Sequence, residues 1–481
     1  MKIRKIILEN NTFFGNQEFS FEDNLGNIYN NIVLAGENGN GKTQLLNIIY
    51  DLCDVELHGP VNSEIRKIYI SFSQEELEYI NQNLRIIKDF SNPTGNFMIE
   101  LDFSALENTW DRVKIKYEKL ENDGGKCYKE LNSSWFFNDI DRHFLFRSIF
   151  STVEINYDPG YTSMVTAKDV DIEIKRSIRS NTGLASEIQQ LLIDIQTNDA
   201  NDLSTWFDKH PDELPPKQIR NVRINRFKRA FATIFDNLNF SEIINNGSNK
   251  IVLFKKDNHD ISIGALSSGE KQIVFRGAFL LQNQNSSKGC CILIDEPEIS
   301  LHPIWQRKIY DYYKNLFIDI TGNQTSQIFM ATHSQYVLKS ALDNPSNTLI
   351  LLLKNSNSGF SVSHISTPLI LPTITAAEIN YNAFNIVSND YHIELYGYLQ
   401  SIIGNGCSVK DCDEFIKQHS DYDAKLHYKP SCYTNSKSGH KICYETLPTY
   451  IRNAIDHPDS TGTFTDDELQ ISIELLMRLC R

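Results

Sequence analysis

The fold of this chain is decided by residues 31–43, NIVLAGENGNGKT. A short apolar run leads into a loop that contains three glycines, and a helical apolar pattern follows from Thr43 to Leu52. In this order of strand, loop and helix, backbone N–H groups and the positive end of the helix dipole surround a phosphate. The segment therefore predicts a nucleotide-binding loop within an α/β fold.

The phosphate loop, residues 36–43, fits the pattern GxxxxGKT. Its glycines allow the backbone to wrap closely around an anion. Lys42 is expected to reach the β- and γ-phosphate oxygens, and the Thr43 hydroxyl is expected to ligate Mg²⁺. We predict that ATP and Mg²⁺ are the cofactors, held by Gly36, Asn38, Gly39, Asn40, Gly41, Lys42, Thr43 and Gln44.

Two later apolar runs end in residues that complete such a site. ILIDEP (292–297) places Asp295 to hold Mg²⁺ through water and Glu296 to orient or deprotonate the attacking water. QIFMATHS (327–334) ends in His333, whose imidazole can contact the γ-phosphate. The predicted metal residues are therefore Thr43 and Asp295, and the predicted catalytic residues are Glu296 and His333.

A second glycine-marked segment, LSSGEKQ (266–272), begins a capped helix over Ser267–Leu281. This signature segment could close over the nucleotide of a neighbouring subunit, through Ser267, Ser268, Gly269 and Glu270. It predicts a homodimer or higher homo-oligomer that assembles around ATP.

The remaining pattern indicates two domains. Short apolar strands that alternate with helices predict a parallel α/β sheet, and three β-rich runs before residue 120 predict an antiparallel side sheet. Periodicity turns helical over residues 169–239, which we interpret as an insertion. We place the domain boundary near residue 365, with an ATPase domain over 1–365 and a mostly helical domain over 366–481 for assembly and effector binding.

Composition limits the class of protein. The 481 residues carry a net charge of −14, and no apolar run approaches the roughly 20 residues that a membrane span needs. Nine cysteines without a CxxC pair do not look like a disulfide framework and fit a reducing compartment. The acidic balance argues against a chain that coats nucleic acid with its whole surface. We therefore expect a cytoplasmic protein with no membrane partner.

GxxxxGKT, LSSGEKQ, ILIDEPEISLHP and ATHS, in that order, resemble the ABC-type ATPase superfamily, particularly the SMC-like, AAA-type single-chain ATPases of bacterial anti-phage defence, over residues 1–355. The resemblance implies an ABC-type head in which Ser267, Gly269 and Glu270 contact the γ-phosphate bound to the opposing protomer. It also implies that 300–302 crosses the dimer interface and that His333 is a switch histidine.

Two residue choices depart from that family pattern. Ser268 stands where a glycine is frequent, and no clear glutamine follows the strand expected over Ser151–Tyr157, where Glu154 or Asn156 could substitute. The departures are compatible with slow hydrolysis, or with ATP acting mainly as a clamp.

A second resemblance lies in the C-terminal segments AEINY (377–381), HIELYGYL (392–399) and LPTYIRNAIDHP (447–458). They are similar to the tails of the PtuA ATPases of the Septu system, also found beside retrons, which work with the HNH nuclease PtuB. This resemblance implies a sensor and scaffold whose partner subunit cleaves nucleic acid.

Two other functions remain open at this stage. A DNA-binding SMC-like ATPase of repair or recombination would use a basic stripe that could bind nucleic acid or an acidic partner, or could be a solvated helix face paired with acids such as Asp212 and Glu213. A self-contained ribonuclease would use Arg452 and His457, which match the RNxxxH pattern of HEPN enzymes, although Pro458 indicates that the helix ends there and that His457 caps it. The stripe comprises Lys217, Arg220, Arg223, Arg226, Lys228 and Arg229.

Overall fold

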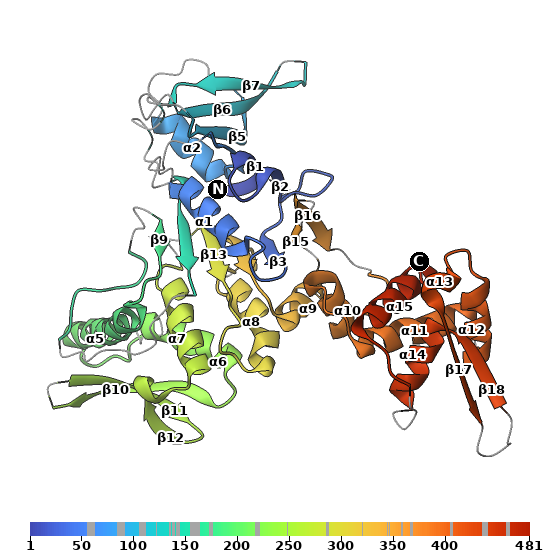
Figure 1. Ribbon diagram of the computed structural model, residues 1–481. Coiled ribbons are helices and arrows are strands. Elements are labelled where there is room, and N and C mark those ends of the chain that lie inside the picture. The colour runs from blue at the N-terminus through green and yellow to red at the C-terminus, as the bar shows by residue number, and fades with distance from the viewer. Residues whose placement is uncertain are drawn as a thin grey trace. The chain divides into compact units, whose positions relative to one another are not determined.

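A computed structural model describes most of the chain, and it divides the chain into two compact units, Met1–His364 and Ile365–Arg481 (Figure 1). Each unit is described by itself below. No helix among the described residues is long and apolar enough to cross a membrane. The described residues are 1–54, 63–83, 92–104, 112–121, 123–133, 136, 140, 145–153, 164–172, 177–216, 222–247, 249–284, 288–319, 321–343, 345, 347–356, 359–365, 369–404, 407–434, 441–457 and 462–481.

The central sheet of the first unit has the strand order β16-β15-β3-β14-β13-β8-β9. The strands from β15 to β9 in that order run parallel. The strands β3, β13 and β14 are buried along their whole length, as apolar strands of a parallel sheet are. Because these three are neighbours, their carboxyl ends meet at one edge. The bounds are β3 Asn31–Ala35, β8 Ser148–Ser151, β9 Ile178–Arg179, β13 Cys291–Asp295, β14 Gln327–Ala331, β15 Thr348–Ser356 and β16 Gly359–Ile365.

An antiparallel sheet of order β2-β1-β4-β5-β6-β7 forms the side sheet. Helix α1 (Lys42–Asp54) contributes Leu45, Leu46 and Ile49 to one hydrophobic core that also takes side chains from both sheets. This shared core fixes the helix that begins at the phosphate loop. The bounds are β1 Lys2–Asn11, β2 Gly15–Ser20, β4 Ile65–Ser71, α2 Gln74–Asn83, β5 Pro93–Asp102, β6 Val113–Leu120 and β7 Lys126–Leu131.

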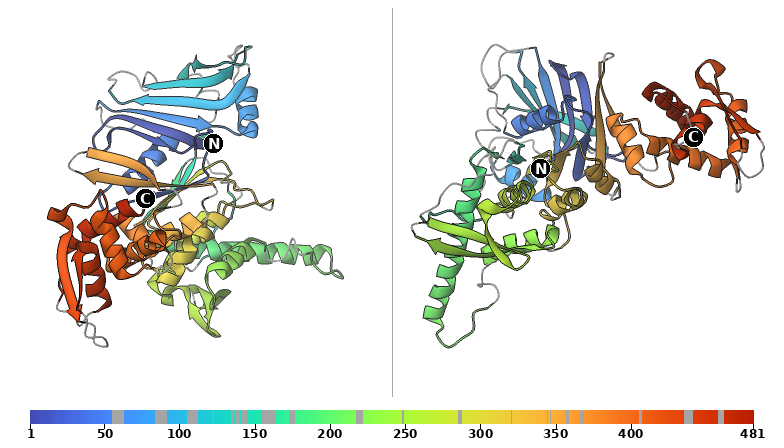
Figure 2. Two further views of the ribbon diagram at one scale, coloured as in Figure 1. Left: turned by 90° about the vertical axis from the view of Figure 1, so that its right-hand side faces the viewer. Right: turned by 60° about the horizontal axis from the view of Figure 1, so that its bottom comes forward.

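The helical insertion lies between β9 and β10. Its helix α5 (Leu184–Lys209) extends away from the rest of the first unit (Figure 2), and α6 (Val222–Ile234) packs against α5 and α7. The prediction of an α/β fold with a parallel sheet, an antiparallel side sheet and a helical insertion is therefore confirmed. The remaining elements are β10 Leu238–Asn246, β11 Asn249–Lys256, β12 His259–Ser262, the 3₁₀ helix η1 Ile263–Ala265, α7 Ser268–Leu281, α8 Pro303–Asn315 and α9 Gln335–Asp343.

The second unit is a helical cluster around its own core, to which Tyr391, Leu395, Ile451 and Leu476 contribute. It also contains an antiparallel hairpin of β17 and β18 that the sequence pattern did not predict. The bounds are α10 Ala376–Phe384, α11 Asn389–Ile403, α12 Val409–Gln418, α13 Ala424–His427, β17 Tyr428–Thr434, β18 Lys441–Thr446, α14 Leu447–Asp456 and α15 Asp466–Leu479.

One pair of cysteines corrects the expectation drawn from cysteine spacing. Cys432 and Cys443 form a disulfide, so the expectation of no disulfide was wrong for this pair. The two residues lie directly opposite each other in β17 and β18. Direct opposition across a hairpin brings Cβ atoms close together, and this follows from strand register rather than from any motif.

Candidate nucleotide-binding site

The phosphate loop joins β3 to α1 and depends on glycine at two close approaches. Gly36 has a φ of +140°, and a Cβ there would lie 2.3 Å from the Leu353 carbonyl oxygen. Gly41 has a φ of +81°, and a Cβ there would lie 2.4 Å from the Phe13 ring and 2.9 Å from the Phe14 ring. These phenylalanines belong to the turn between β1 and β2. The turn between the first two strands of the side sheet thus packs against the phosphate loop at Gly41.

Alanine at Gly41 is expected to destabilise the protein more than alanine at Gly39. Both glycines have φ of +81°, but nothing lies within 4 Å of a Cβ at Gly39. Left-handed backbone strain alone costs about 1–2 kcal/mol, and forced overpacking adds about 1–3 kcal/mol. Urea unfolding of Gly41→Ala and Gly39→Ala measures the difference. Equal losses in the free energy of unfolding would contradict the packing of the two rings on the loop.

The ammonium group of Lys42 is buried at the centre of the loop. Its Nζ donates to the carbonyl oxygens of Gly36 at 2.8 Å and Glu37 at 2.9 Å, and lies 3.4 Å from His333 Nδ1. Burial lowers the pKa of Lys42 to about 8, against the opposing effect of nearby carboxylates, of which Glu296 is the strongest. The cation is therefore held by neutral carbonyl groups, an arrangement suited to an incoming anion.

Because only the protonated ammonium attracts phosphate, ATP affinity is expected to fall as the pH rises through about 8. The free protein loses the Lys42 proton in this range, so each further pH unit should weaken binding by about tenfold. Binding measured between pH 7 and 9.5 tests this expectation. Lys42→Arg is the matched control, since a guanidinium stays charged throughout. A flat profile for the parent protein would contradict the expected titration.

The predicted metal residues lie within hydrogen-bonding distance of each other. The Thr43 hydroxyl donates to the Asp295 carboxylate, at 2.9 Å to Oδ2 and 3.2 Å to Oδ1. Asp295 is 3% exposed, and its burial raises the pKa of the carboxyl group. A hydroxyl and a carboxylate are oxygen ligands of the kind that Mg²⁺ prefers. The donor set therefore fits the cation that accompanies ATP.

The predicted catalytic residues follow neighbouring strands. His333 Nε2 lies 3.4 Å from Glu296 Oε1, and burial followed by the Lys42 charge lowers the pKa of the imidazole. A neutral ring with its proton on Nε2 satisfies Lys42 on one side and Glu296 on the other. Glu296 has a φ of +43°, a conformation that non-glycine residues rarely adopt and that is concentrated at functional sites.

Glu298 was not among the predicted site residues. One oxygen of its carboxylate accepts the backbone N–H of His333 at 2.6 Å, and Oε2 is buried. Burial raises the pKa of this group. Glu298 therefore connects the segment after β13 to the segment after β14. Its only sequence signal is its place as the third acid of DEPE (295–298).

The other predicted phosphate-loop residues take different positions. Asn40 is buried, and its Nδ2 donates to the Leu353 carbonyl oxygen at 2.9 Å. Asn40 therefore braces the loop from within. Asn38 lies exposed in the loop, and Gln44 is half-buried in the first turn of α1.

The signature segment begins α7 with a capping box. Ser267 accepts the backbone N–H of Glu270, and the Glu270 carboxylate accepts the backbone N–H of Ser267 at 2.8 Å. Lys256 on β11 pairs with Glu270 at 2.7 Å. A Cβ on Gly269 would lie 2.7 Å from the Ser300 carbonyl oxygen. The signature segment and the loop predicted to cross the interface therefore pack against each other, with Ser268 exposed in the first turn of α7.

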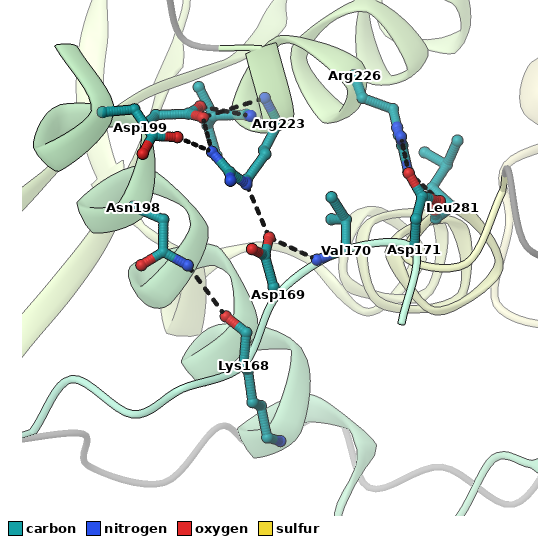
Figure 3. Close-up of polar contacts among 11 residues, drawn as sticks. Lys168, Asp169, Val170, Asp171, Asn198, Asp199, Arg223, Arg226 and Leu281 are labelled. Carbon is teal, nitrogen blue, oxygen red and sulfur yellow. Dashed lines mark hydrogen bonds and ion pairs between the residues drawn. The ribbon is translucent and has the colours of Figure 1, made fainter. Parts of the chain in front are cut away.

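Two arginines of the basic stripe, both on α6, form ion pairs with acids. Arg223 forms ion pairs with Asp169 at 2.8 Å, Asp199 at 3.1 Å and Asp202 at 2.7 Å, while Arg226 donates to Asp171 at 2.9 Å (Figure 3). These two arginines are therefore paired with acids, as the alternative of a solvated helix face expected, but the acids belong to α5 and to residues 169–171 and are not Asp212 and Glu213. Lys217 and Arg220 lie outside the described residues. Arg229 is bonded to the Asn225 carbonyl oxygen, and Lys228 lies over the Phe240 ring.

The two residues named for a ribonuclease, Arg452 and His457, lie in α14 and at its C-cap. Arg452 pairs with Asp456 at 2.7 Å, one turn along α14. Helix α14 ends at Asp456 with His457 as its C-cap, as Pro458 indicated, and His457 is exposed. The structure records no contact between Arg452 and His457. The candidate glutamine substitutes Glu154 and Asn156 lie outside the described residues.

The fold and site define an α/β domain whose motif residues gather at the carboxyl edge of a parallel sheet. Residues 32–339 match the family described as "AAA domain, putative AbiEii toxin, Type IV TA system". The match covers more than half of the chain, so the chain belongs to this AAA family. No curated protein matches it.

Among the solved structures similar to the chain are three for which the similarity covers 76% of the chain. An Smc head bound to the C-terminal winged-helix domain of ScpA has 15% identity, a TM-score of 0.40 and 98% of its own length covered. The SMC head domain from Thermotoga maritima has 12% identity, a TM-score of 0.36 and 100% of its own length covered. A Pyrococcus furiosus Smc head with an extended coiled coil, bound to the C-terminal domain of ScpA, has 14% identity, a TM-score of 0.40 and 96% of its own length covered.

Proposed function

We propose that this chain binds and hydrolyses ATP with Mg²⁺ and dimerises with nucleotide between its protomers. The single observation that carries the proposal is that five polar side chains converge from three neighbouring strand ends. Lys42 contacts His333, His333 contacts Glu296, and Thr43 donates to Asp295. Bound ATP would supply a triphosphate whose terminal phosphoryl group is transferred to water. The protein would orient the triphosphate and neutralise the charge of the triphosphate.

The roles of individual groups follow from their positions. Lys42 would exchange its carbonyl partners for phosphate oxygens, and Thr43 with Asp295 would hold the cation. Glu296 would orient or deprotonate water, while His333 keeps the Glu296 carboxylate directed into the site. Among the described residues, the recorded hydrogen bonds of Ser267 run to Glu270 and to Lys271 of its own helix, and none runs to the phosphate loop. Ser267 is also exposed at the start of α7, and this accessibility supports a role toward the nucleotide of a second protomer.

We further propose that the nucleotide-bound form recruits and regulates a partner nuclease of the HNH class in anti-phage defence. The PtuA-like segments of the C-terminal unit support this proposal, as does a family description that includes a toxin of a toxin–antitoxin system. The ion pairs of Arg223 and Arg226 weigh against direct DNA binding through α6. We propose that the second unit provides the assembly and effector-binding surface.

Mass measurement tests both parts. The parent protein, of 55.3 kDa, should double in mass with ATP and Mg²⁺ when hydrolysis is blocked, and should remain unassembled with ADP. Co-expression with an HNH nuclease encoded beside it should then yield a complex whose nuclease activity depends on the bound nucleotide. A mass that never responds to ATP would refute the dimer. A nuclease that neither binds nor responds would refute the partner while leaving the ATPase intact.

A further inference from the structure

Arg276 is the bulkiest of the fully buried side chains among the described residues, at 0% exposure. It lies in the middle of α7, within the otherwise apolar stretch 273–281. A buried cation costs several kcal/mol unless it is well satisfied. Arginine at such a position therefore needs an account beyond packing.

The donors of Arg276 converge on two strand ends. Its Nε donates to Ser151 Oγ at 2.8 Å, and its Nη2 donates to the carbonyl oxygens of Ser151 at 3.0 Å and Asp295 at 2.5 Å. Its Nη1 donates to the Glu296 carbonyl oxygen at 3.0 Å. One guanidinium thus joins the end of β8 to the end of β13. The rigid planar fork of arginine suits this task, and a lysine ammonium does not.

No ion pair of Arg276 is recorded among the described residues, and its contacts are to neutral oxygens. Burial raises the pKa of the nearby Asp295 carboxyl group, and the positive charge of Arg276 opposes this rise. Arg276 therefore holds the backbone of Asp295 and Glu296 without taking up either carboxylate. Both side chains stay available to the site.

The hydrogen bond from Arg276 to Glu296 also restrains the backbone conformation of Glu296. A residue with φ of +43° persists only when its surroundings hold it there. The bond from Arg276 to the Glu296 carbonyl oxygen and the bond from the Glu296 N–H to the Ala331 carbonyl oxygen, at 2.9 Å, restrain both of its peptide groups. Arg276 thus helps direct the Glu296 side chain toward His333.

The same helix carries the signature segment at its start. Ser267 caps α7, and Arg276 lies nine residues further on, about 14 Å along a helix that rises about 1.5 Å per residue. Helix α7 is therefore a rigid connection between the surface around Ser267 and the strand ends that bear Asp295 and Glu296.

We infer that Arg276 is a positioning residue that couples movement of the signature helix to the placement of Asp295 and Glu296. Contact of Ser267 with a second protomer would then be transmitted to the metal and water side of the same subunit. The consequence for ATP turnover rests on the proposed function, whereas the mechanical coupling exists in the nucleotide-free protein.

Hydrogen–deuterium exchange of the nucleotide-free protein tests the coupling directly. In Arg276→Met, amide exchange over residues 295–300 and 267–272 should rise by about tenfold, while the strand interior at 291–294 stays protected. Methionine fills the space without charge, so a purely packing role predicts no local change. Arg276→Lys keeps the charge but not the fork and should show the same local rise. Arg307→Met, at an exposed arginine of α8, is the matched control.

Each outcome decides the matter. Parent-like exchange in both Arg276 variants would overturn the coupling, and so would a rise that includes 291–294 and reflects general loosening. When a nonhydrolysable ATP analogue is added, parent protein should gain protection in both segments and Arg276→Met only around the phosphate loop. Protection of both segments in the variant would also overturn it. A parent that binds no nucleotide would refute the proposed function, and the nucleotide-free exchange would still decide the coupling.

Discussion

Replacing Lys42 with alanine is expected to abolish ATP binding at ordinary assay concentrations. Lys42 is 5% exposed, and its recorded contacts are to two carbonyl oxygens of its own loop and to the His333 imidazole. Because no carboxylate is recorded in an ion pair with it among the described residues, its charge is available to phosphate. Two charged hydrogen bonds of about 1.5–3 kcal/mol each correspond to a loss of at least about 100-fold in affinity. Titration with a fluorescent ATP analogue measures the loss.

The matched control for this substitution is Lys209→Ala, an exposed lysine at the last turn of α5. It should bind ATP as the parent does. Lys42→Ala should still fold, because it removes a buried cation rather than an apolar contact, and thermal unfolding checks this. Unchanged ATP affinity in a folded Lys42→Ala protein would mean that the phosphate loop is not the nucleotide site.

Replacing Glu296 with glutamine is expected to reduce hydrolysis by about 100- to 10,000-fold, the usual contribution of a general base. ATP binding should persist, because the amide keeps the shape of the carboxylate and Lys42, Thr43 and Asp295 are untouched. The ATP-bound dimer should consequently accumulate. Phosphate release under saturating ATP gives the rate, and light scattering gives the mass of the trapped form.

An exposed acid supplies the control, and Glu213→Gln should hydrolyse ATP at the parent rate. If Glu296→Gln retained parent activity, Glu296 would have no part in activating water, and another group near His333 would have to be sought. If the variant lost activity but never accumulated a dimer, the nucleotide would not be shared between protomers.

The motifs predicted which residues lie at the carboxyl edge of the sheet because each motif follows a short apolar run that is visible in the sequence. Residues 31–43, 292–297 and 327–334 each pair an apolar strand with a polar terminus. Parallel pairing in register then brings these termini together. Hydrophobic burial orders the strands, and the polar ends have no alternative but to meet.

The sequence could not reveal groups whose role arises from contacts distant along the chain. Arg276 looks like a surface arginine until β8 and β13 are placed beside it. The acids that neutralise Arg223 come from segments 21 to 54 residues away, so counting charges along α6 gave a misleading picture. The hairpin that pairs Cys432 with Cys443 likewise depends on register.

The aromatic turn beneath the phosphate loop extends the nucleotide pocket to a part of the chain that carries no motif. Side chains 13 and 14 occupy the space that any residue larger than glycine at 41 would need. These three positions are therefore expected to covary. Across relatives, a bulkier residue at 41 should appear only together with smaller residues at 13 or 14.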